Sequence, residues 1–546
     1  MKRVLFEKNT VLASDTCYYA DQKQYDIYLS DTIRCEDKKY LSIHTDTFGF
    51  LSVAFLIHGL KNVTLDFQGA KLVLHGRIHP FIIDRSENIT IKNCSVVYDR
   101  AFFTEAEILE VSEGQILIHI NENFPCRVGN GYLIPTSETW ENHDLNKGEM
   151  FLQVFDKNTR EGAGLMVGVI GETVYRRPIP PCEVQHLKVR AAGEDVILSG
   201  KFPADWRSGL IVVLAHEYRD KNSILMCDSR NCIIENYRII NGASFGIMAM
   251  HTENITIRHL VLHYDQESPG ITANAADAVH TIACSGEILI EDSIFEGMID
   301  DAINVHSNYY LAEAIDGCHL SAVKDKRSSF LNAHCTVIDQ GDEIAIYNGL
   351  TMELKETFRV CRAIIEDDYT VDLLLDRSVS GINKGDMIEN LSAQARLTLR
   401  NCQFGKANTH LRLQTRGTIL IENCECSLPI ILTGDTNFWF ESSPVRDLTI
   451  RNCRFLGPKG VIRIIPEFTP TAKEPYYHQN IRIIGNEFDA AVPLVANRAD
   501  NLVFKQNKLT SPGQTFRLIL KNCGRADTDA CEVERLSEDQ TVRPGS

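Results

Sequence analysis

The chain has 546 residues, of which 44% are hydrophobic and 24% charged, and its formal net charge at pH 7 is −17. This composition is typical of a folded globular protein and excludes a disordered one. The acidic excess argues against a broad basic surface for nucleic acid or an anionic membrane, and no apolar run is long enough to cross a bilayer. The length exceeds what one compact core ordinarily holds, unless the chain is built from repeats.

Self-similar units recur along the chain, and each alternates apolar with polar residues before a turn at Asn or Gly. Such units begin near residues 62, 88, 231, 254, 287, 397, 418, 448, 480 and 501. Their spacing of roughly 20–35 residues is that of solenoids. A strand with one apolar face cannot bury it alone, so stacked copies share one core, and Asn side chains can bond from turn to turn. The sequence therefore predicts an all-β fold, a right-handed parallel β-helix with Asn ladders.

Two stretches lack the Asn-turn repeat and are rich in short β runs. Insertions in solenoids map to loops, so each stretch is expected to form a small inserted β-barrel. The polar end of the chain is expected to be frayed. The predicted order is an N-terminal β-helix part (1–100), an inserted barrel (101–222), β-helix (223–316), a second inserted barrel (317–392), C-terminal β-helix (393–523) and a polar tail (524–546).

The 17 cysteines lack zinc-type spacing, and several follow Asn in strand-like units, as small buried hydrophobes do. These are Cys94, Cys232, Cys402, Cys424 and Cys453. Reduced thiols favour a cytoplasmic protein, and the first residues lack the apolar core of a secretory signal. A secreted protein is the alternative if a signal peptide has been removed.

Three aspartates stand out in the apolar strand pattern. Asp300 and Asp301 are adjacent, and Asp277 lies one repeat earlier, at an offset of 301 − 277 = 24 residues. If 24 residues form one coil, Asp277 stacks on Asp301 at the strand spacing of about 4.8 Å, whereas Asp300 points away unless a turn or bulge re-aims it. Acids clustered on a sheet face cost folding energy, so such a cluster points to chemistry.

Polar neighbours accompany the acids, namely His280, Asn304 and His306. Two carboxyl groups on either side of a water are the arrangement of an inverting glycosidase. The bland alternative is that each Asp is a turn residue that bonds its own backbone. A calcium site is a third option, which the apolar and His neighbours disfavour.

Further downstream, Arg412, Gln414 and Arg416 alternate onto one strand face, where they either bond sugar hydroxyls or form a solvated surface. Glu441 follows Trp439 by two residues. An exposed Trp can stack on a sugar while the acid bonds hydroxyls, although plain core packing is the alternative for Trp439.

These motifs resemble those of glycoside hydrolase family 110, the α-1,3-galactosidases. The resemblance rests on the segments 276–280, 299–306 and 440–452 and runs over most of the chain, both inserted stretches included; Ser307 stands where the family pattern has Gly. It implies a β-helical, metal-independent, inverting exo-enzyme that removes terminal α-1,3-linked galactose, in some cases from blood group B glycans. The three catalytic acids of the family would fall on Asp277, Asp300 and Asp301.

The sequence thus predicts an inverting exo-α-galactosidase without cofactor or metal. Asp277 and Asp301 would activate water and Asp300 would protonate the leaving group. The substrate-binding residues would be His280, Asn304, His306, Arg412, Gln414, Trp439 and Glu441. The expected partner is a galactose-terminated glycan, with a homodimer as an option. The alternatives are a polygalacturonase-like hydrolase, disfavoured by the lack of Lys and Arg from 293 to 310, and a non-catalytic carbohydrate-binding β-helix.

Overall fold

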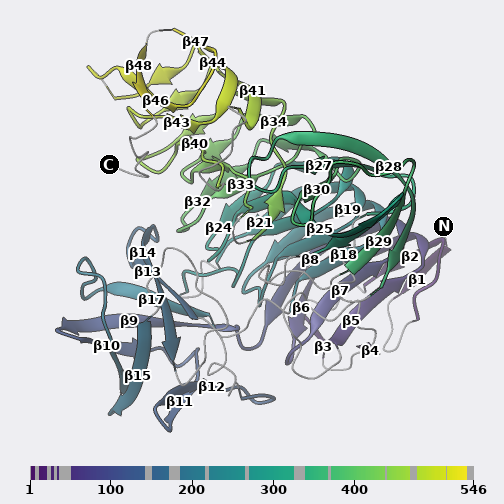
Figure 1. Ribbon diagram of the computed structural model, residues 1–546. Coiled ribbons are helices and arrows are strands. Elements are labelled where there is room, and N and C mark those ends of the chain that lie inside the picture. Colours follow the sequence, from purple (N-terminus) through teal and green to yellow (C-terminus); the bar gives the residue numbers. More distant parts are fainter. Residues whose placement is uncertain are drawn as a thin grey trace.

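A computed structural model gives the architecture of the chain (Figure 1). The residues it describes are 2–5, 11–20, 26–29, 33–35, 51–141, 150–170, 185–215, 221–264, 270–324, 338–366, 370–436, 439–467, 476–511, 513–529 and 531–537. The regular elements in these ranges are strands, and no helix among them is long and apolar enough to cross a membrane.

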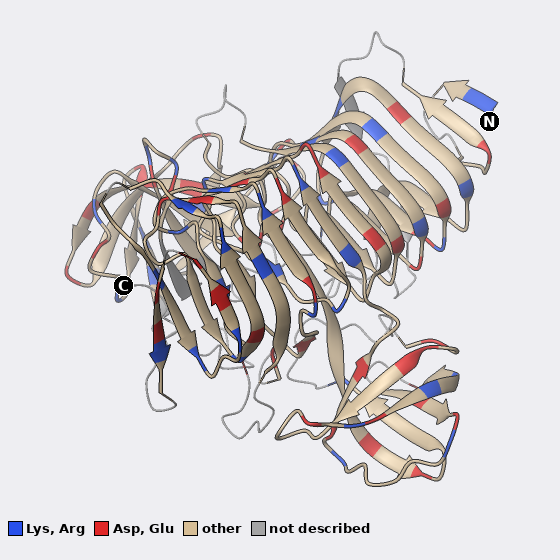
Figure 2. Ribbon diagram, turned by 90° about the horizontal axis from the view of Figure 1, so that it is seen from above, with Lys and Arg blue, Asp and Glu red and all other residues tan. Residues whose placement is uncertain are grey.

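The strands stack into a parallel β-helix, as predicted, and Figure 2 shows successive coils side by side along its length, with acidic and basic residues interspersed. Each coil contributes strand segments to three faces. The first two faces are joined in the long strands β6 (Lys61–Leu74), β8 (Glu87–Tyr98), β19 (Arg230–Ile239) and β21 (Glu253–Leu262). They separate in later coils, as in β23 (Ser285–Glu291) with β24 (Ile294–Glu296), and β31 (Arg396–Arg400) with β32 (Gln403–Gly405).

The third face carries the acid motifs. Its strands, in stacking order, are β5 (Leu51–His58), β7 (His79–Asp84), β18 (Ile224–Cys227), β20 (Ile247–Met250), β22 (Val279–Ile282), β25 (Ile303–Asp316), β33 (Leu411–Leu413), β36 (Ile430–Leu432), β40 (Ile462–Ile464), β43 (Leu494–Asn497), β46 (Phe516–Lys521) and β48 (Cys531–Leu536). Because β47 (Ala526–Thr528) and β48 pair with β44 (Ala499–Lys505) and β46, the expectation of a frayed tail from 524 is wrong for these residues.

Asparagine ladders hold the turns, as the repeat pattern predicts. The Nδ2 of Asn88 donates to Oδ1 of Asn62 at 2.8 Å, and Asn231 donates to Asn88 at 2.9 Å. These residues have φ between 55° and 58°, the left-handed region that Asn tolerates. The same side chains therefore satisfy both the backbone geometry of the turn and the bonding between coils.

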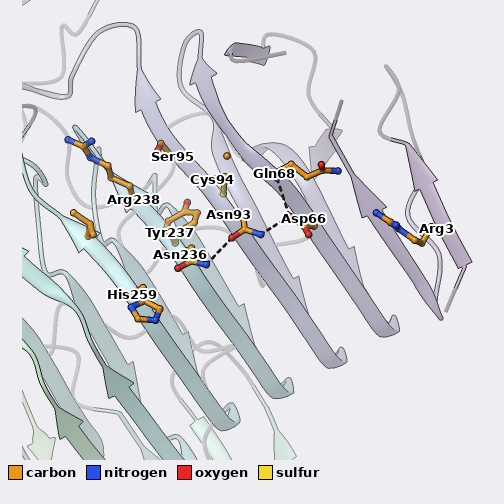
Figure 3. Close-up of a pocket in the computed structure, with 12 residues that line it drawn as sticks. Arg3, Asp66, Gln68, Asn93, Cys94, Ser95, Asn236, Tyr237, Arg238 and His259 are labelled. Atoms are coloured by element: carbon orange, nitrogen blue, oxygen red, sulfur yellow. Dashed lines mark hydrogen bonds between the residues drawn. The ribbon is translucent and has the colours of Figure 1, made fainter. Parts of the chain in front are cut away.

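A second ladder lies where the long strands bend, and it lines a groove of about 790 Å³ on the N-terminal coils (Figure 3). Asn236 donates to Asn93 at 2.9 Å, and Asn93 donates to Asp66 at 2.8 Å. The residues that line this groove do not include any member of the acid cluster.

The interior is a continuous stack of aliphatic and aromatic side chains. The five cysteines predicted to be core residues are buried within it, and the 14 cysteines whose side chains the structure describes are free thiols. Burial raises the pKa of Cys232 and Cys284 to about 12, so these two thiols stay protonated at neutral pH.

A first closed barrel leaves the stack between β8 and β18, and it lies to one side of the β-helix (Figure 1). Its strands are β9 (Phe103–Ser112), β10 (Gln115–Ile120), β13 (Met150–Asp156), β14 (Gly162–Ile170), β15 (Gln185–Ala192), β16 (Asp195–Ser199) and β17 (Leu210–Ala215), with the hairpin β11 (Cys126–Gly129) and β12 (Tyr132–Pro135) beside it. The first and last strands pair, Phe103 opposite Ala215.

A second ring of strands follows the coil that carries Asp300 and Asp301. It consists of β25, β26 (His319–Val323), β29 (Thr370–Leu375), β28 (Leu354–Ile365), β27 (Glu343–Tyr347) and β30 (Met387–Asn390), which returns to β25. It begins at Tyr309 and not at 317, because β25 runs without a break from the β-helix into the barrel.

Candidate active site

The register of the third face brings the acid motifs together. His280 pairs with Asn304 and Asn304 with Arg412 on the neighbouring parallel strands β22, β25 and β33. The amide of Ala278 donates to the carbonyl of Asp301 at 2.9 Å. The predicted 24-residue offset is therefore confirmed, and Asp277 and Asp301 occupy equivalent positions in adjacent coils.

The three aspartates lie in bends just before the strands, not within strands as their apolar surroundings suggest. β22 begins at Val279 and β25 begins at Ile303. An aspartate side chain can bond a neighbouring backbone amide and so favour a bend over a strand. Here Oδ1 of Asp300 accepts from the amide of Asp301 at 3.0 Å. Strand alternation therefore does not fix the direction of Asp300, which is partly exposed.

The bends are closely packed, and side-chain to backbone hydrogen bonds hold them. Asn274 donates from Nδ2 to the carbonyls of Ala276 at 3.0 Å and Asp277 at 2.9 Å. Gly297 has φ +73°, and a Cβ there would lie 2.8 Å from the carbonyl oxygen of Ile271. A side chain at 297 would therefore push the bend with Asp300 away from the preceding coil.

Asp277 begins a chain of hydrogen-bond contacts that continues through two buried histidines. Its Oδ2 lies 2.6 Å from Nδ1 of His280, and Nε2 of His280 lies 2.9 Å from Nε2 of His306. Nδ1 of His306 lies 2.6 Å from the carbonyl oxygen of Ser307. These contacts fix one carboxylate oxygen of Asp277, while the other, Oδ1, is buried without a hydrogen-bond partner among the described residues.

Asp301 lies beside a histidine and an arginine. Its carboxylate lies 2.9 Å from Nε2 of His410 and 3.5 Å from Nε of Arg412. Burial acts to raise the pKa of Asp301, but His410 and Arg412 outweigh it and lower this pKa to about 2. Asp301 is therefore ionised at neutral pH. His410 is not among the residues predicted from the sequence. Its position directly before the polar face of β33 could have indicated it.

A third wall comes from β37 (Glu441–Ser442), which runs antiparallel to β25. Oε2 of Glu441 accepts from Gln414 at 2.8 Å and lies 3.7 Å from Nη1 of Arg412, and Oε1 lies 3.7 Å from Nε2 of His306. Burial opposes ionisation of Glu441, but His306 and Arg412 leave its pKa lowered. Glu441 is thus a second fixed negative charge.

Several buried polar atoms of this face have no hydrogen-bond partner among the described residues. They are Oδ1 of Asp277, Oδ1 of Asn304, Nη1 of Arg412 and Oε1 of Gln414. Buried donors and acceptors ordinarily find partners, and a mixture of both kinds on one face matches a ligand rich in hydroxyl groups. Among the described residues, no group of three or more His, Cys, Asp or Glu side chains is arranged to hold a metal ion.

The remaining predicted residues divide between two environments. Trp439 is partly exposed beside Glu441, and its amide donates to Asp435. Arg416 instead joins the second barrel, where it pairs with Glu389 at 2.7 Å and donates to the hydroxyl of Tyr347. Of the polar residues on β33 and just after it, Arg412 and Gln414 belong to the acid cluster and Arg416 to the barrel contact.

The first barrel contacts the bends that carry the acids. Buried Glu105 accepts from the amides of Ile271 at 2.9 Å and Thr272 at 2.7 Å, and Gln153 donates to the carbonyl of Ile299, next to Asp300. Burial raises the pKa of Glu105 to about 7, although these amides oppose the shift. No local sequence pattern indicates this contact, because it joins residues over 140 positions apart.

No family model matches the chain. It is 26% identical over 507 residues to alpha-1,3-galactosidase B of Bacteroides thetaiotaomicron, covering 89% of this chain and 79% of that protein. It is 26% identical over 496 residues to alpha-1,3-galactosidase A of Shewanella woodyi (88% and 78%) and 25% identical over 555 residues to alpha-1,3-galactosidase A of Bacteroides fragilis (95% and 87%).

These similarities to proteins named α-1,3-galactosidase support an assignment of the chain to glycoside hydrolase family 110. The relationship extends over most of the chain, as the sequence motifs predicted. The alignment with a solved structure described as a glycoside hydrolase covers 86% of this chain and 88% of that protein. Its TM-score is 0.19 and its sequence identity is 8%, which is too low a similarity to indicate a shared fold. The related proteins support a glycoside hydrolase, and their names imply a glycan as the substrate class.

Proposed function

We propose that the protein is an inverting exo-α-1,3-galactosidase that releases terminal galactose from glycans, blood group B type glycans included. The observation that carries the proposal is the alignment of Asp277 over Asp301 on a buried face whose unpartnered atoms suit sugar hydroxyls. The names of the related proteins support the linkage and the sugar.

The proposed chemistry is a single displacement at the anomeric carbon. Asp300, the most exposed of the three acids, protonates the departing glycosidic oxygen. A water is held between Asp277 and Asp301, and Asp277 takes its proton through Oδ1. Asp301, which is held ionised with its pKa at about 2, stabilises the positive charge that develops on the sugar ring.

The remaining residues would bind the galactose. Arg412, Asn304 and Gln414 present a donor and two acceptors to its hydroxyls, and Glu441 would accept a further hydroxyl proton. Trp439, which is partly exposed beside Glu441, would stack on a sugar face. Each of these roles needs the side chain to lie on the outward side of the third face.

Release of free galactose from Galα1-3Gal tests the proposal, with a fucosylated B-type trisaccharide and a Galα1-4-linked disaccharide in parallel. Proton NMR follows the first product anomer. We expect β-galactose first, from the α-1,3 linkage, and a loss of at least about a hundredfold in Asp300→Asn and Asp301→Asn. Initial α-galactose would overturn inversion, and no release from any substrate by a folded protein would overturn the activity.

A further inference from the structure

The hydrogen bonds that run from Asp277 to the backbone of Ser307 fix a number of protons. There are three contacts: Asp277 with His280, His280 with His306, and His306 with the carbonyl of Ser307. Each contact joins two atoms at 2.6 to 2.9 Å and so needs one proton between them. An ionised aspartate and two neutral imidazoles supply only two protons. The chain of contacts therefore holds one proton more.

The direction of the bonds follows from the carbonyl end. A carbonyl only accepts, so Nδ1 of His306 donates to Ser307. The amide nitrogen of Asn308 lies 3.5 Å from the same ring nitrogen, too far to compete with the 2.6 Å contact. If His306 is neutral, its Nε2 is an acceptor, and Nε2 of His280 must carry the proton that lies between the two rings.

The position of the additional proton follows from the charges around the pair. Burial, which outweighs the attraction of Glu441 at 3.7 Å, lowers the pKa of His306 to about 4, so His306 is neutral. His280 lies 2.6 Å from a carboxylate oxygen. The other charged groups that act on the two rings are Asp301, Glu441 and Arg412. The carboxylates outnumber the guanidinium, which favours the additional proton. Imidazole is a stronger base than a carboxylate, so the proton lies on Nδ1 of His280.

We infer that His280 is a doubly protonated imidazolium that holds Asp277 as a carboxylate, which makes His280 a positioning residue for the base of the proposed reaction. The base role rests on the proposed function, whereas the proton count does not. If the proton between Asp277 and His280 were lost, the lone pair of Nδ1 of His280 would face the Asp277 carboxylate at hydrogen-bond distance, and the two would repel each other. Asp277 therefore enters the reaction as a carboxylate, and Oδ1 is the oxygen left to take the proton of the water.

The proton count can be measured without turnover, by ¹⁵N NMR of protein labelled at histidine, at pH 7. Spectra of His280→Gln and His306→Gln assign the signals. We expect three of the four ring nitrogens of His280 and His306 to carry protons, namely both nitrogens of His280 and Nδ1 of His306. Two protonated nitrogens, or both on His306, would overturn the inference. A neutron structure of the wild-type protein gives the same count without any variant.

A matched pair of variants separates this role from simple packing. In His306→Gln the amide oxygen still accepts from Nε2 of His280, whereas His306→Leu removes the acceptor and lets His280 become neutral. In the wild-type protein, the loss of the second proton of His280 should contribute to a fall of kcat/KM at alkaline pH, in addition to the deprotonation of Asp300. We expect this contribution to persist in His306→Gln and to disappear in His306→Leu. Equal pH profiles in two folded variants would overturn the positioning role. Absence of galactosidase activity with the proton count intact would refute the proposed function alone.

Discussion

Glu105 makes the contact between the first barrel and the acid-bearing bends pH-dependent. Its carboxyl group is buried, and its pKa of about 7 in the folded protein lies above the ordinary 4.5. Between these values the folded protein retains a proton that the unfolded chain has lost, so stability falls as the pH rises. The contribution is fully present below pH 4.5 and is lost by pH 7, and its size is about 3 kcal/mol.

Hydrogen exchange measures this contribution locally. The amides of Ile271 and Thr272 donate to Glu105, so their protection reports opening of this contact. We expect their protection factors, corrected for intrinsic exchange, to fall about a hundredfold from pH 4.5 to 7.5 in the wild-type protein. In Glu105→Gln, whose amide oxygen still accepts from both amides, they should stay level. The same slope in both proteins would refute the reasoning.

Three further substitutions have defined outcomes. Asn88→Ala removes two ladder bonds and leaves a β-carbon at φ 58°, so urea unfolding should show a loss of about 2–4 kcal/mol, against about 1–2 for Asn88→Gly. Glu389→Gln leaves the guanidinium of Arg416 without its anionic partner, and a loss of about 3 kcal/mol should appear as faster proteolysis within the second barrel. Trp439→Ala should raise KM for a disaccharide severalfold with little change in kcat; a fall in kcat alone would contradict a stacking role.

The local pattern of the sequence predicts much of the fold. Period-two alternation and Asn at regular turns predict the coils and the ladders, because both depend on neighbours within one repeat. The 24-residue offset likewise followed from two aligned segments. Whether Asp277 and Asp301 sit in strands or bends could not be read in this way, because the apolar residues around them suit both.

Contacts that cross an insertion left no local signal. His410 reaches Asp301 only after the second barrel has returned the chain to the stack, and Glu105 reaches Thr272 from the first barrel. The separation of Arg416 from Arg412 depends on Glu389, a barrel residue. Alternation places these arginines on one face but cannot tell which partner each one meets.

The closure of each barrel by its own first and last strands has a consequence for how the chain folds. Neighbouring coils are usually joined by about 20–35 residues, but Asn88 and Asn231, which bond in one ladder, are separated by 143. A flexible connection of that length would slow the search for coil pairing. Once β9 and β17 have paired, Phe103 and Ala215 are adjacent, and the chain that remains between Asn88 and Asn231 is within the usual spacing of two coils. We therefore expect the barrels to form before the coils on either side of them stack, so that the β-helix grows across each insertion as if it were absent.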